Sequence, residues 1–218
     1  MENALKMNCY FKHIICPLPK FWLSFSYLII DLRKILKTLL LPEGTFQTEV
    51  LSFDESDRET LRSIYLDWRK LCQDLNSLDS RGINLPEGLS ESAFCLEMNC
   101  YRITKSISGA NTSFDAYDPF SKSRIQVKAC SVLPDLTSFG PRSVWDKFFF
   151  VDFYRNGDWN GLFDIYFIEN NLIYNHKVNS QQTFKDQQEQ NRRPRFSIYR
   201  EIILERKIQP IKTGNLNI

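Results

Sequence analysis

The chain has 218 residues, of which 43% are hydrophobic and 25% are charged, a composition typical of a globular protein that buries its own core. These values exclude a wholly disordered chain, a collagen-like chain and a membrane protein with several spans. Lys and Arg number 28 and Asp and Glu number 26, so the net charge of +2 does not by itself indicate a polyanionic partner.

Cysteine and histidine usage narrows the possible chemistry. No two cysteines form a C-x-x-C pair, which argues against a zinc ribbon or a thioredoxin-like site, and we expect free, buried thiols in a reducing bacterial cytoplasm. With only His13 and His176, most histidine-based metal sites and Ser-His-Asp catalysis are also disfavoured. The cysteines are Cys9, Cys16, Cys72, Cys95, Cys100 and Cys130.

The N-terminal part of the chain is unusually apolar, most densely over Phe21–Ile30. Lys20 and Asp31 bound this run at about half the length of roughly 20 residues that a membrane-spanning helix needs, so we expect no membrane association. The residues after it do not resemble a signal-peptide cleavage site. The pattern favours an amphipathic helix over Trp22–Leu40 or an extension outside the folded domain, and a mis-assigned start codon remains an alternative.

A shift in charge predicts a domain boundary at Pro42-Glu43-Gly44. Residues 1–42 carry six basic and two acidic side chains, whereas residues 43–60 carry one basic and six acidic side chains. We therefore expect an N-terminal extension over residues 1–42, of uncertain structure, and one domain over residues 43–218.

Two helices are predicted next along the chain. Ser56-x-x-Glu59 has the spacing of a capping box, and apolar residues then recur at helical spacing, which predicts a helix over about 55–76. A loop over Asn76–Gly88 leads to a second predicted helix over Ser90–Tyr101.

The remainder is richer in strand patterns. We expect strands over Ser113–Tyr117 and Ser123–Ser131, and a hairpin of Phe148–Tyr154 with Leu162–Ile168 around Asn156-Gly157. Leu172–Tyr174 is a possible short strand, while Phe196–Ile203 is compatible with strand or helix. This order predicts an α/β or α+β fold with a central mixed sheet flanked by helices.

One cluster of residues in these strands has the pattern of a catalytic site. Gln126 and Lys128 lie two residues apart in a strand and share a face, while Ile125 and Val127 point to the opposite face and can be buried. Asp115, in the preceding strand, lies opposite them if the two strands form a hairpin. A carboxylate, an amide and an ammonium would then converge. Carboxylate and amide oxygens are ligands suited to Mg²⁺, and the ammonium can stabilise charge that develops on phosphorus.

This pattern resembles the PD-(D/E)XK nuclease superfamily, with Gln126 at the position usually held by an acid. The resemblance covers Asp115 through Lys128 and the helix before them, and implies a restriction-endonuclease-like fold. Asp118 is a second candidate for the first acid, but it precedes Pro119 and is typical of a turn. The literal Pro134-Asp135 follows the other motif residues instead of preceding them, so it does not match.

Because Gln126 carries no charge, another carboxylate is expected to complete the site. In this superfamily a helix before the core often supplies a Glu, and Leu89-Ser90-Glu91 resembles that element. The resemblance therefore implies a catalytic set of Asp115, Gln126, Lys128 and Glu91. Of these, Asp115, Glu91 and Gln126 would bind the metal, and Glu87 is the alternative to Glu91.

Over residues 80–200 the chain resembles, more narrowly, the type II restriction endonucleases that recognise GCNGC. The resemblance implies double-stranded DNA as substrate, Mg²⁺ as cofactor, cleavage to 5′-phosphate and 3′-hydroxyl ends, a homodimer, and a cognate DNA methyltransferase as genetic partner. It rests on three stretches: RGINLPEGLSE from Arg81, SISGAN from Ser106 and RPRFS from Arg193.

The C-terminal region has the charge expected of a DNA-binding surface. Residues 176–212 carry nine Lys or Arg against four Asp or Glu. Arginine and lysine neutralise phosphates, and arginine is the commonest reader of guanine in the major groove. The candidate DNA contacts are Arg142, His176, Lys177, Arg192, Arg193 and Arg195.

Two other functions remain compatible with these residues. The first is another nuclease of the same superfamily, such as a repair or junction-cleaving enzyme. The second is a DNA-binding protein that kept the fold and lost catalysis, because Gln126 removes one anionic ligand.

Overall fold

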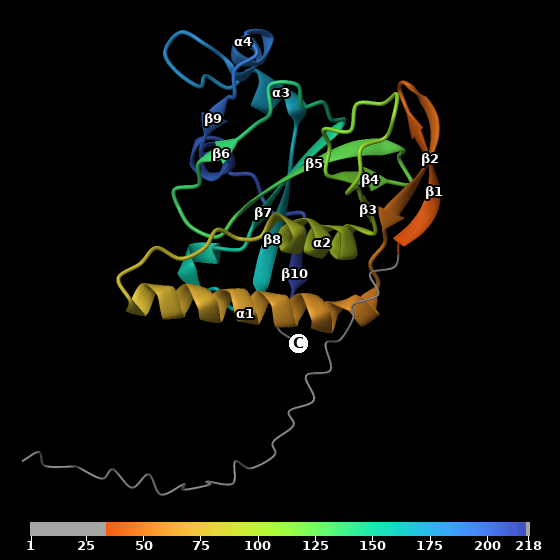
Figure 1. The fold of residues 1–218 in the computed structure, drawn as a ribbon. Helices are drawn as coiled ribbons and strands as arrows, with labels where there is room; N and C mark the ends of the chain where they lie inside the picture. The colour runs from red at the N-terminus through yellow and green to blue at the C-terminus, as the bar shows by residue number, and fades with distance from the viewer. Residues whose placement is uncertain (1–33, 217–218) are drawn as a thin grey trace, which may run out of the picture.

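The computed structural model describes residues 34–216, which form an eight-stranded mixed sheet with helices against both faces (Figure 1). The predicted mixed sheet flanked by helices is confirmed. The strand order is β1-β2-β3-β4-β5-β7-β8-β10, and β5 and β7 are parallel neighbours. The strands are β1 (Lys34–Leu41), β2 (Gly44–Leu51), β3 (Tyr101–Arg102), β4 (Ala116–Asp118), β5 (Ser123–Cys130), β7 (Lys147–Asp152), β8 (Leu162–Ile168) and β10 (Lys212–Asn215).

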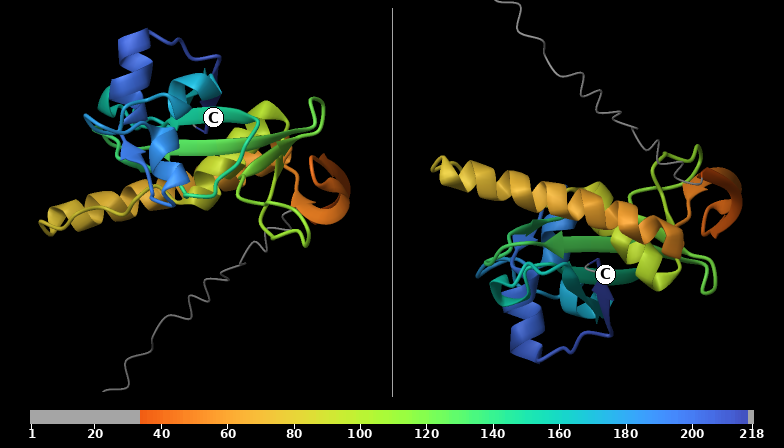
Figure 2. Two further views of the ribbon diagram at one scale, coloured as in Figure 1. Left: turned by 90° about the horizontal axis from the view of Figure 1, so that it is seen from above. Right: turned by 90° about the horizontal axis from the view of Figure 1, so that it is seen from below.

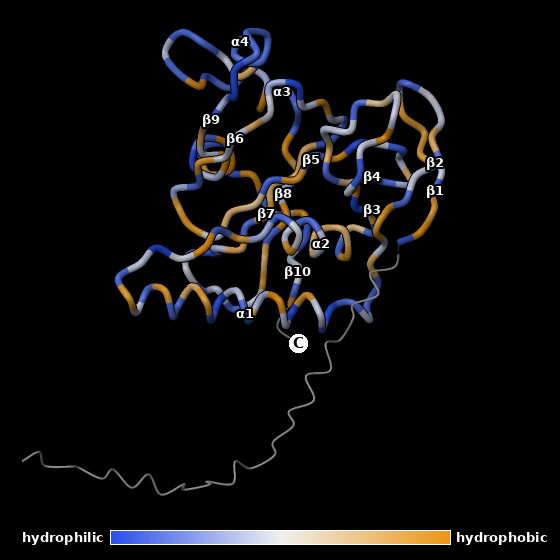
Figure 3. Tube along the Cα trace, in the orientation of Figure 1, coloured by the Kyte–Doolittle hydropathy of each residue, from blue (hydrophilic) through white to orange (hydrophobic). Residues whose placement is uncertain are grey.

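The centre of the sheet is formed by β5, β7 and β8, which are apolar because both of their faces are covered (Figure 3). In β7, Phe149 and Val151 pack in the core under the long helices, while Phe148 and Phe150 pack in the core on the other face. The expected hairpin of β7 with β8 is confirmed, with Asn156-Gly157 in a short 3-10 turn, η2 (Arg155–Gly157).

Helices α1 (Arg58–Ser77) and α2 (Glu87–Met98) cover one face of the sheet (Figure 2). Helix α1 confirms the first predicted helix. Its buried residues lie at helical spacing: Leu61, Tyr65, Trp68 and Cys72. The predicted capping box was wrong, because Asp54 and Asp57 exchange the capping hydrogen bonds around a 3-10 turn, η1 (Glu55–Asp57), immediately before α1.

Helix α2 begins three residues earlier than predicted and ends at Met98. The helix stops there because Asn99 adopts a left-handed conformation, with φ of 53°, after which Tyr101 enters β3. The shift places Glu87 in the first turn of α2, so that Glu87 and Glu91 lie one turn apart on the same side of the helix.

The other face of the sheet is covered by C-terminal elements. A small sheet of β6 (Thr137–Ser138) with β9 (Arg195–Phe196) lies there with α3 (Asn170–Tyr174), α4 (Phe184–Glu189) and a π-helix, η3 (Tyr199–Leu204) (Figure 2). The possible strand at Leu172–Tyr174 was wrong, since these residues form α3. The ambiguous segment Phe196–Ile203 contains both a strand end and the π-helix.

The described residues begin with a β-hairpin. The helix predicted over Trp22–Leu40 is wrong for its described part, because Lys34–Leu41 form β1 and pair along their whole length with β2. Leu39 and Leu41 are buried in a cluster with Ile107, Phe114 and other residues from outside the hairpin, which favours strand over helix. The boundary expected at Pro42-Glu43-Gly44 falls in the turn of the hairpin, and residues 1–33 of the expected extension lie outside the described residues.

The cysteines in the described range are free thiols and buried, as predicted: Cys72, Cys95, Cys100 and Cys130. Cys9 and Cys16 lie outside that range. Trp145 is 4% exposed and belongs to the core beneath the C-terminal elements. None of the helices in residues 34–216 has the length and apolarity needed to span a membrane.

Candidate active site

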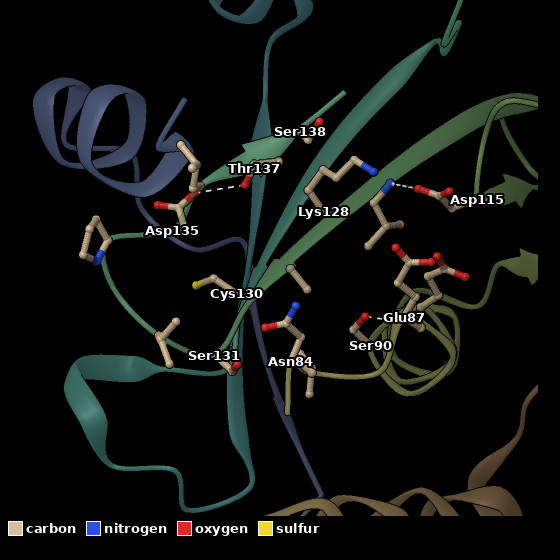
Figure 4. Close-up of a pocket in the computed structure, with 17 residues that line it drawn as sticks. Asn84, Glu87, Ser90, Asp115, Lys128, Cys130, Ser131, Asp135, Thr137 and Ser138 are labelled. Atoms are coloured by element: carbon tan, nitrogen blue, oxygen red, sulfur yellow. Dashed lines mark hydrogen bonds between the residues drawn. The ribbon is translucent and has the colours of Figure 1, made fainter. Parts of the chain in front are cut away.

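A polar cleft of about 510 Å³ opens between α2, β5 and β6 (Figure 4). It combines the start of α2, the second half of β5 and the segment that leads into β6. Figure 4 shows the side chains of Asp115, Glu87 and Lys128 directed toward this common space. Its polar lining residues are Asn84, Glu87, Ser90, Glu91, Asp115, Lys128, Ser131, Asp135, Thr137 and Ser138.

The cleft exists because β4 is much shorter than β5. The two strands pair antiparallel, as predicted, but their ladder stops at Ala116 opposite Ile125. Beyond that pair the edge of β5 has no neighbouring strand, and its residues from Val127 onward face the cleft. The carboxylate of Asp115 takes the place of the missing strand, since its Oδ2 accepts the backbone N–H of Val127 at 2.8 Å.

Gln126 lies beside Asp115 as the hairpin prediction required, but it does not line the cleft. Its side chain is 2% exposed, and its amide nitrogen donates a hydrogen bond to Oδ2 of Asp115. We had expected Gln126 to project into the cleft with Lys128 as a metal ligand. Burial against β4 and the neighbouring β7 instead directs its amide to the carboxylate, so the geometry favours a role in positioning Asp115.

The carboxyl group of Asp115 is in an environment that disfavours its charge. Burial raises the pKa of Asp115 to about 7, the nearby carboxylates of Glu91 and Glu87 add to that increase, and the ammonium of Lys128 and the Val127 N–H oppose it. Asp115 is therefore a buried carboxyl group whose charged form a cation in the cleft would favour.

Glu91 projects from α2 toward the same cleft, held by Arg102 of β3. Arg102 Nε donates to Glu91 Oε2 at 2.7 Å, and both side chains are largely buried. Burial raises the pKa of Glu91, and Arg102 opposes this effect. Within residues 34–216 the other oxygen, Oε1, has no hydrogen bond, so it remains available to a ligand. Glu87, one turn earlier, is exposed.

Lys128 supplies the positive group of the cleft. Its side chain is partly exposed, lines the cleft, and makes no hydrogen bond or ion pair with any described residue. Structural lysines near acids commonly form such pairs, as Lys147 does with Asp118 at 3.0 Å. An unpaired ammonium beside a carboxylate cluster is available to a bound anion.

The two alternative aspartates both have structural partners. Asp118 accepts hydrogen bonds from Phe120 and Ser121 and pairs with Lys147, as expected for a turn residue. Asp135 is 5% exposed, and its oxygens accept hydrogen bonds from Thr137, Ser197, Ile198 and Tyr199. Neither carboxylate is free to replace Asp115.

The candidate DNA contacts are distributed unevenly around the cleft. Arg195 is exposed on β9, opposite Ser138 of the cleft wall, and Arg192 and Arg193 are exposed in the loop before it. Arg142 is exposed in the loop that follows β6, and Lys177 is exposed after α3. Four arginines therefore border the β6 side of the cleft or its neighbouring loops.

The structure gives His176 partners within the fold. Its ring stacks on Phe196 with centroids 4.2 Å apart, and its Nε2 lies 3.0 Å from Glu201 Oε2. The side chain is only 15% exposed, so little of its ring faces solvent. The sequence shows only that a basic residue, Lys177, follows His176. It gives no information on partners that are distant in the chain, such as Phe196 and Glu201.

Arg102 was missed entirely by the sequence analysis. It sits eleven residues after Glu91, and only the turn between α2 and β3 brings the two together. Glu91 and Arg102 belong to different elements, so neither helical nor strand periodicity in the sequence indicates that they pair.

Comparisons with known proteins show the family of this chain. The family model described as Bsp6I restriction endonuclease matches residues 53–205, which contain the whole cleft. The chain belongs to this family. The type II restriction enzyme Bsp6I from Bacillus sp. (strain RFL6) is 31% identical over 164 residues, covering 75% of this chain and 90% of the relative. No solved structure matches the chain significantly.

Membership of the Bsp6I family makes the chain a type II restriction endonuclease, and DNA is its partner. The narrower resemblance stated from the sequence is thus confirmed at the level of enzyme class. Within residues 34–216, no three His, Cys, Asp or Glu side chains form a group able to hold a metal ion by themselves.

Proposed function

We propose that the chain hydrolyses phosphodiester bonds of double-stranded DNA at GCNGC, with Mg²⁺ as cofactor, leaving 5′-phosphate ends. The observation that carries this proposal is the convergence of Asp115, Glu91 and Lys128 on one polar cleft of a Bsp6I-family chain. The specificity is that of the family which the sequence resembles.

The donor set in the cleft fits Mg²⁺. Its ligands would be the carboxylate oxygens of Asp115 and Glu91, which are hard donors, and Mg²⁺ usually keeps several waters, so two protein ligands suffice. Burial, with smaller contributions from Glu91 and Glu87, raises the pKa of Asp115, and a divalent cation beside it would favour its charged form. When bound, the ion supplies Lewis acidity and lowers the pKa of water.

The protein's own groups would position the scissile phosphate. The Lys128 ammonium, unpaired among the described residues, would contact a phosphate oxygen and stabilise the negative charge that develops on it in the transition state. Gln126 and the Val127 N–H would hold Asp115 in one orientation, while Arg102 holds Glu91. Residues of β5 would thus orient Asp115, and a residue of β3 would orient Glu91.

DNA would approach along the arginine-bordered side of the cleft. The exposed Arg192, Arg193 and Arg195 are suited to phosphates, with Lys177 further along the same C-terminal region. A near-palindromic site would be bound by a homodimer, because two-fold sites mirror two-fold proteins. Such an enzyme also requires a methyltransferase that protects the host's own sites.

Cleavage of a sequenced plasmid with Mg²⁺, followed by run-off sequencing of the ends, tests this proposal. We expect discrete fragments with ends only at GCNGC, and no cleavage with EDTA. Fragments with ends at unrelated sequences would indicate a repair or junction nuclease, and binding without cleavage would indicate a DNA-binding protein that lost catalysis.

A further inference from the structure

A second hollow, of about 380 Å³, adjoins the catalytic cleft. Both walls continue from one hollow into the other: Ser113 of the second hollow lies two residues before Asp115, and Gly140 lies two residues after Ser138 of the cleft. A duplex held at the cleft would therefore pass over this hollow. Its lining residues are Ser113, Gly140, Pro141, Arg142, Ser143 and Asn191.

The loop that carries Arg142 is fixed from two sides. On one side, the carbonyl oxygen of Arg142 accepts hydrogen bonds from Asn111 Nδ2 at 3.4 Å and from Ser113 Oγ at 3.3 Å. On the other side, Gln188 Nε2 of α4 donates to the carbonyl oxygens of Gly140 at 3.2 Å and Ser143 at 3.5 Å. The backbone is thus held between the segment that leads to Asp115 and the helix before Asn191.

The side chain of Arg142 is left available by these contacts. It is exposed, and it has no ion pair or side-chain hydrogen bond to the described residues. Other arginines of the fold are paired, for example Arg124 with Asp146 at 2.8 Å and Arg155 with Asp164 at 2.9 Å. The fixed backbone holds the root of this side chain at the hollow, and the planar guanidinium is itself pre-organised for a two-pronged contact.

We propose that this hollow is a nucleobase-recognition site, in which Arg142 donates a pair of hydrogen bonds to the edge of a guanine. The proposal rests on the proposed function, because it assumes duplex DNA in the adjoining cleft. A guanidinium matches the O6 and N7 acceptors of guanine, and the amide of Asn191 adds donor and acceptor groups beside it. Ser113, which donates a hydrogen bond to the carbonyl oxygen of Arg142, lies two residues before Asp115, so a short stretch of backbone connects this hollow to the catalytic cleft.

A phosphate contact is the competing role for the same arginine, and the two roles have different signatures. A base contact affects one position of the recognition site, whereas a phosphate contact affects all sequences alike and contributes to the salt dependence of binding. The variant Arg142→Lys separates them further, because lysine keeps the charge and loses the planar fork.

The experiment compares wild type, Arg142→Ala, Arg142→Lys and Asn191→Ala on a GCNGC duplex and on duplexes with one G·C pair replaced by A·T. Arg206→Ala, an exposed arginine outside both hollows, is the matched control. Single-turnover cleavage with Mg²⁺ and binding to an unrelated duplex in EDTA over a range of salt concentrations are measured. Thermal melting confirms that each variant is folded.

We expect Arg142→Ala and Arg142→Lys to cleave GCNGC about 10- to 100-fold more slowly and to lose discrimination at one position of the site. Arg142→Lys should keep the wild-type affinity for the unrelated duplex. Equal losses on every duplex with a smaller salt slope would overturn the proposal in favour of a phosphate contact, and a wild-type profile would exclude any contact. Absence of cleavage by the wild type itself would instead refute the proposed function.

Discussion

The side-chain amide of Gln126 donates a hydrogen bond to the carboxylate of Asp115, just before β4 begins and where β5 has no strand neighbour on that side. The same oxygen also accepts the backbone N–H of Val127. The carboxylate that we place at the centre of the site is therefore held at its base by two donors from one strand. The hydrogen bond gives Gln126 a role in orienting Asp115.

Replacing Gln126 by Ala should slow catalysis without preventing DNA binding. The change removes one of the two donors that orient Asp115, and loss of such a supporting contact typically costs about 10- to 100-fold in activity. Steady-state cleavage should show the loss in kcat with little change in KM. Gln73→Ala, on the exposed side of α1, is the control, and an unchanged kcat for Gln126→Ala would contradict the positioning role.

A comparison of Glu91→Gln with Glu87→Gln can identify which glutamate binds the metal together with Asp115. Both carboxylates line the cleft, but Arg102 orients Glu91 and leaves one of its oxygens available. We expect Glu91→Gln to raise the Mg²⁺ concentration needed for half-maximal cleavage by roughly 10-fold or more, and Glu87→Gln to raise it much less. The reverse order in a Mg²⁺ titration would assign the role to Glu87.

Asp135 is predicted to be important for stability. Its buried carboxylate accepts hydrogen bonds from the hydroxyls of Thr137 and Ser197 and from two backbone N–H groups at the start of η3. Asp135→Ala would leave these donors unpaired, at a cost of roughly 2–4 kcal/mol in the free energy of unfolding. Urea denaturation measures the free energy of unfolding. Asp158→Ala, at an exposed aspartate, is the control. A loss below about 1 kcal/mol would contradict the prediction.

The ion pairs of Glu97 with Arg58 and Lys212 predict how the free energy of unfolding changes at acidic pH. Burial raises the pKa of Glu97, but hydrogen bonds from Arg58 and Lys212 outweigh it and hold the pKa below the usual 4.5. Because the folded pKa is the lower one, this stabilisation is present above the unfolded pKa and is lost as the pH falls through the folded pKa.

Glu97→Gln should therefore destabilise the protein at neutral pH and make less difference in acid. We expect about 2 kcal/mol at neutral pH, less than the roughly 3–5 kcal/mol of a fully buried pair, because Lys212 is partly exposed. Urea denaturation at several pH values measures the difference. A constant difference between wild type and variant down to pH values below 4.5 would show that the charge of Glu97 is not the cause.

The strands of the site could be predicted from the sequence because their residues alternate or are continuously apolar. The hairpin of β4 with β5 could be predicted, and with it the closeness of Asp115 to Gln126. The direction of the Gln126 amide could not be predicted, because it depends on the end of β4, which is set by packing and not by a local motif. β1 was missed for a related reason, since its buried leucines pack against residues that are distant in the sequence, such as Ile107 and Phe114.

Single-turnover cleavage of a GCNGC duplex with Mg²⁺, by Asp115→Asn and Lys128→Ala beside wild type, tests the central claim most directly. Asp74→Asn and Lys70→Ala, an exposed pair on α1, are the matched controls. We predict rates about 100- to 1,000-fold below wild type for the two cleft variants, as for the loss of an electrostatic contact to the transition state, and unchanged rates for the controls. Wild-type rates for Asp115→Asn or Lys128→Ala would contradict the assignment of this cleft as the active site.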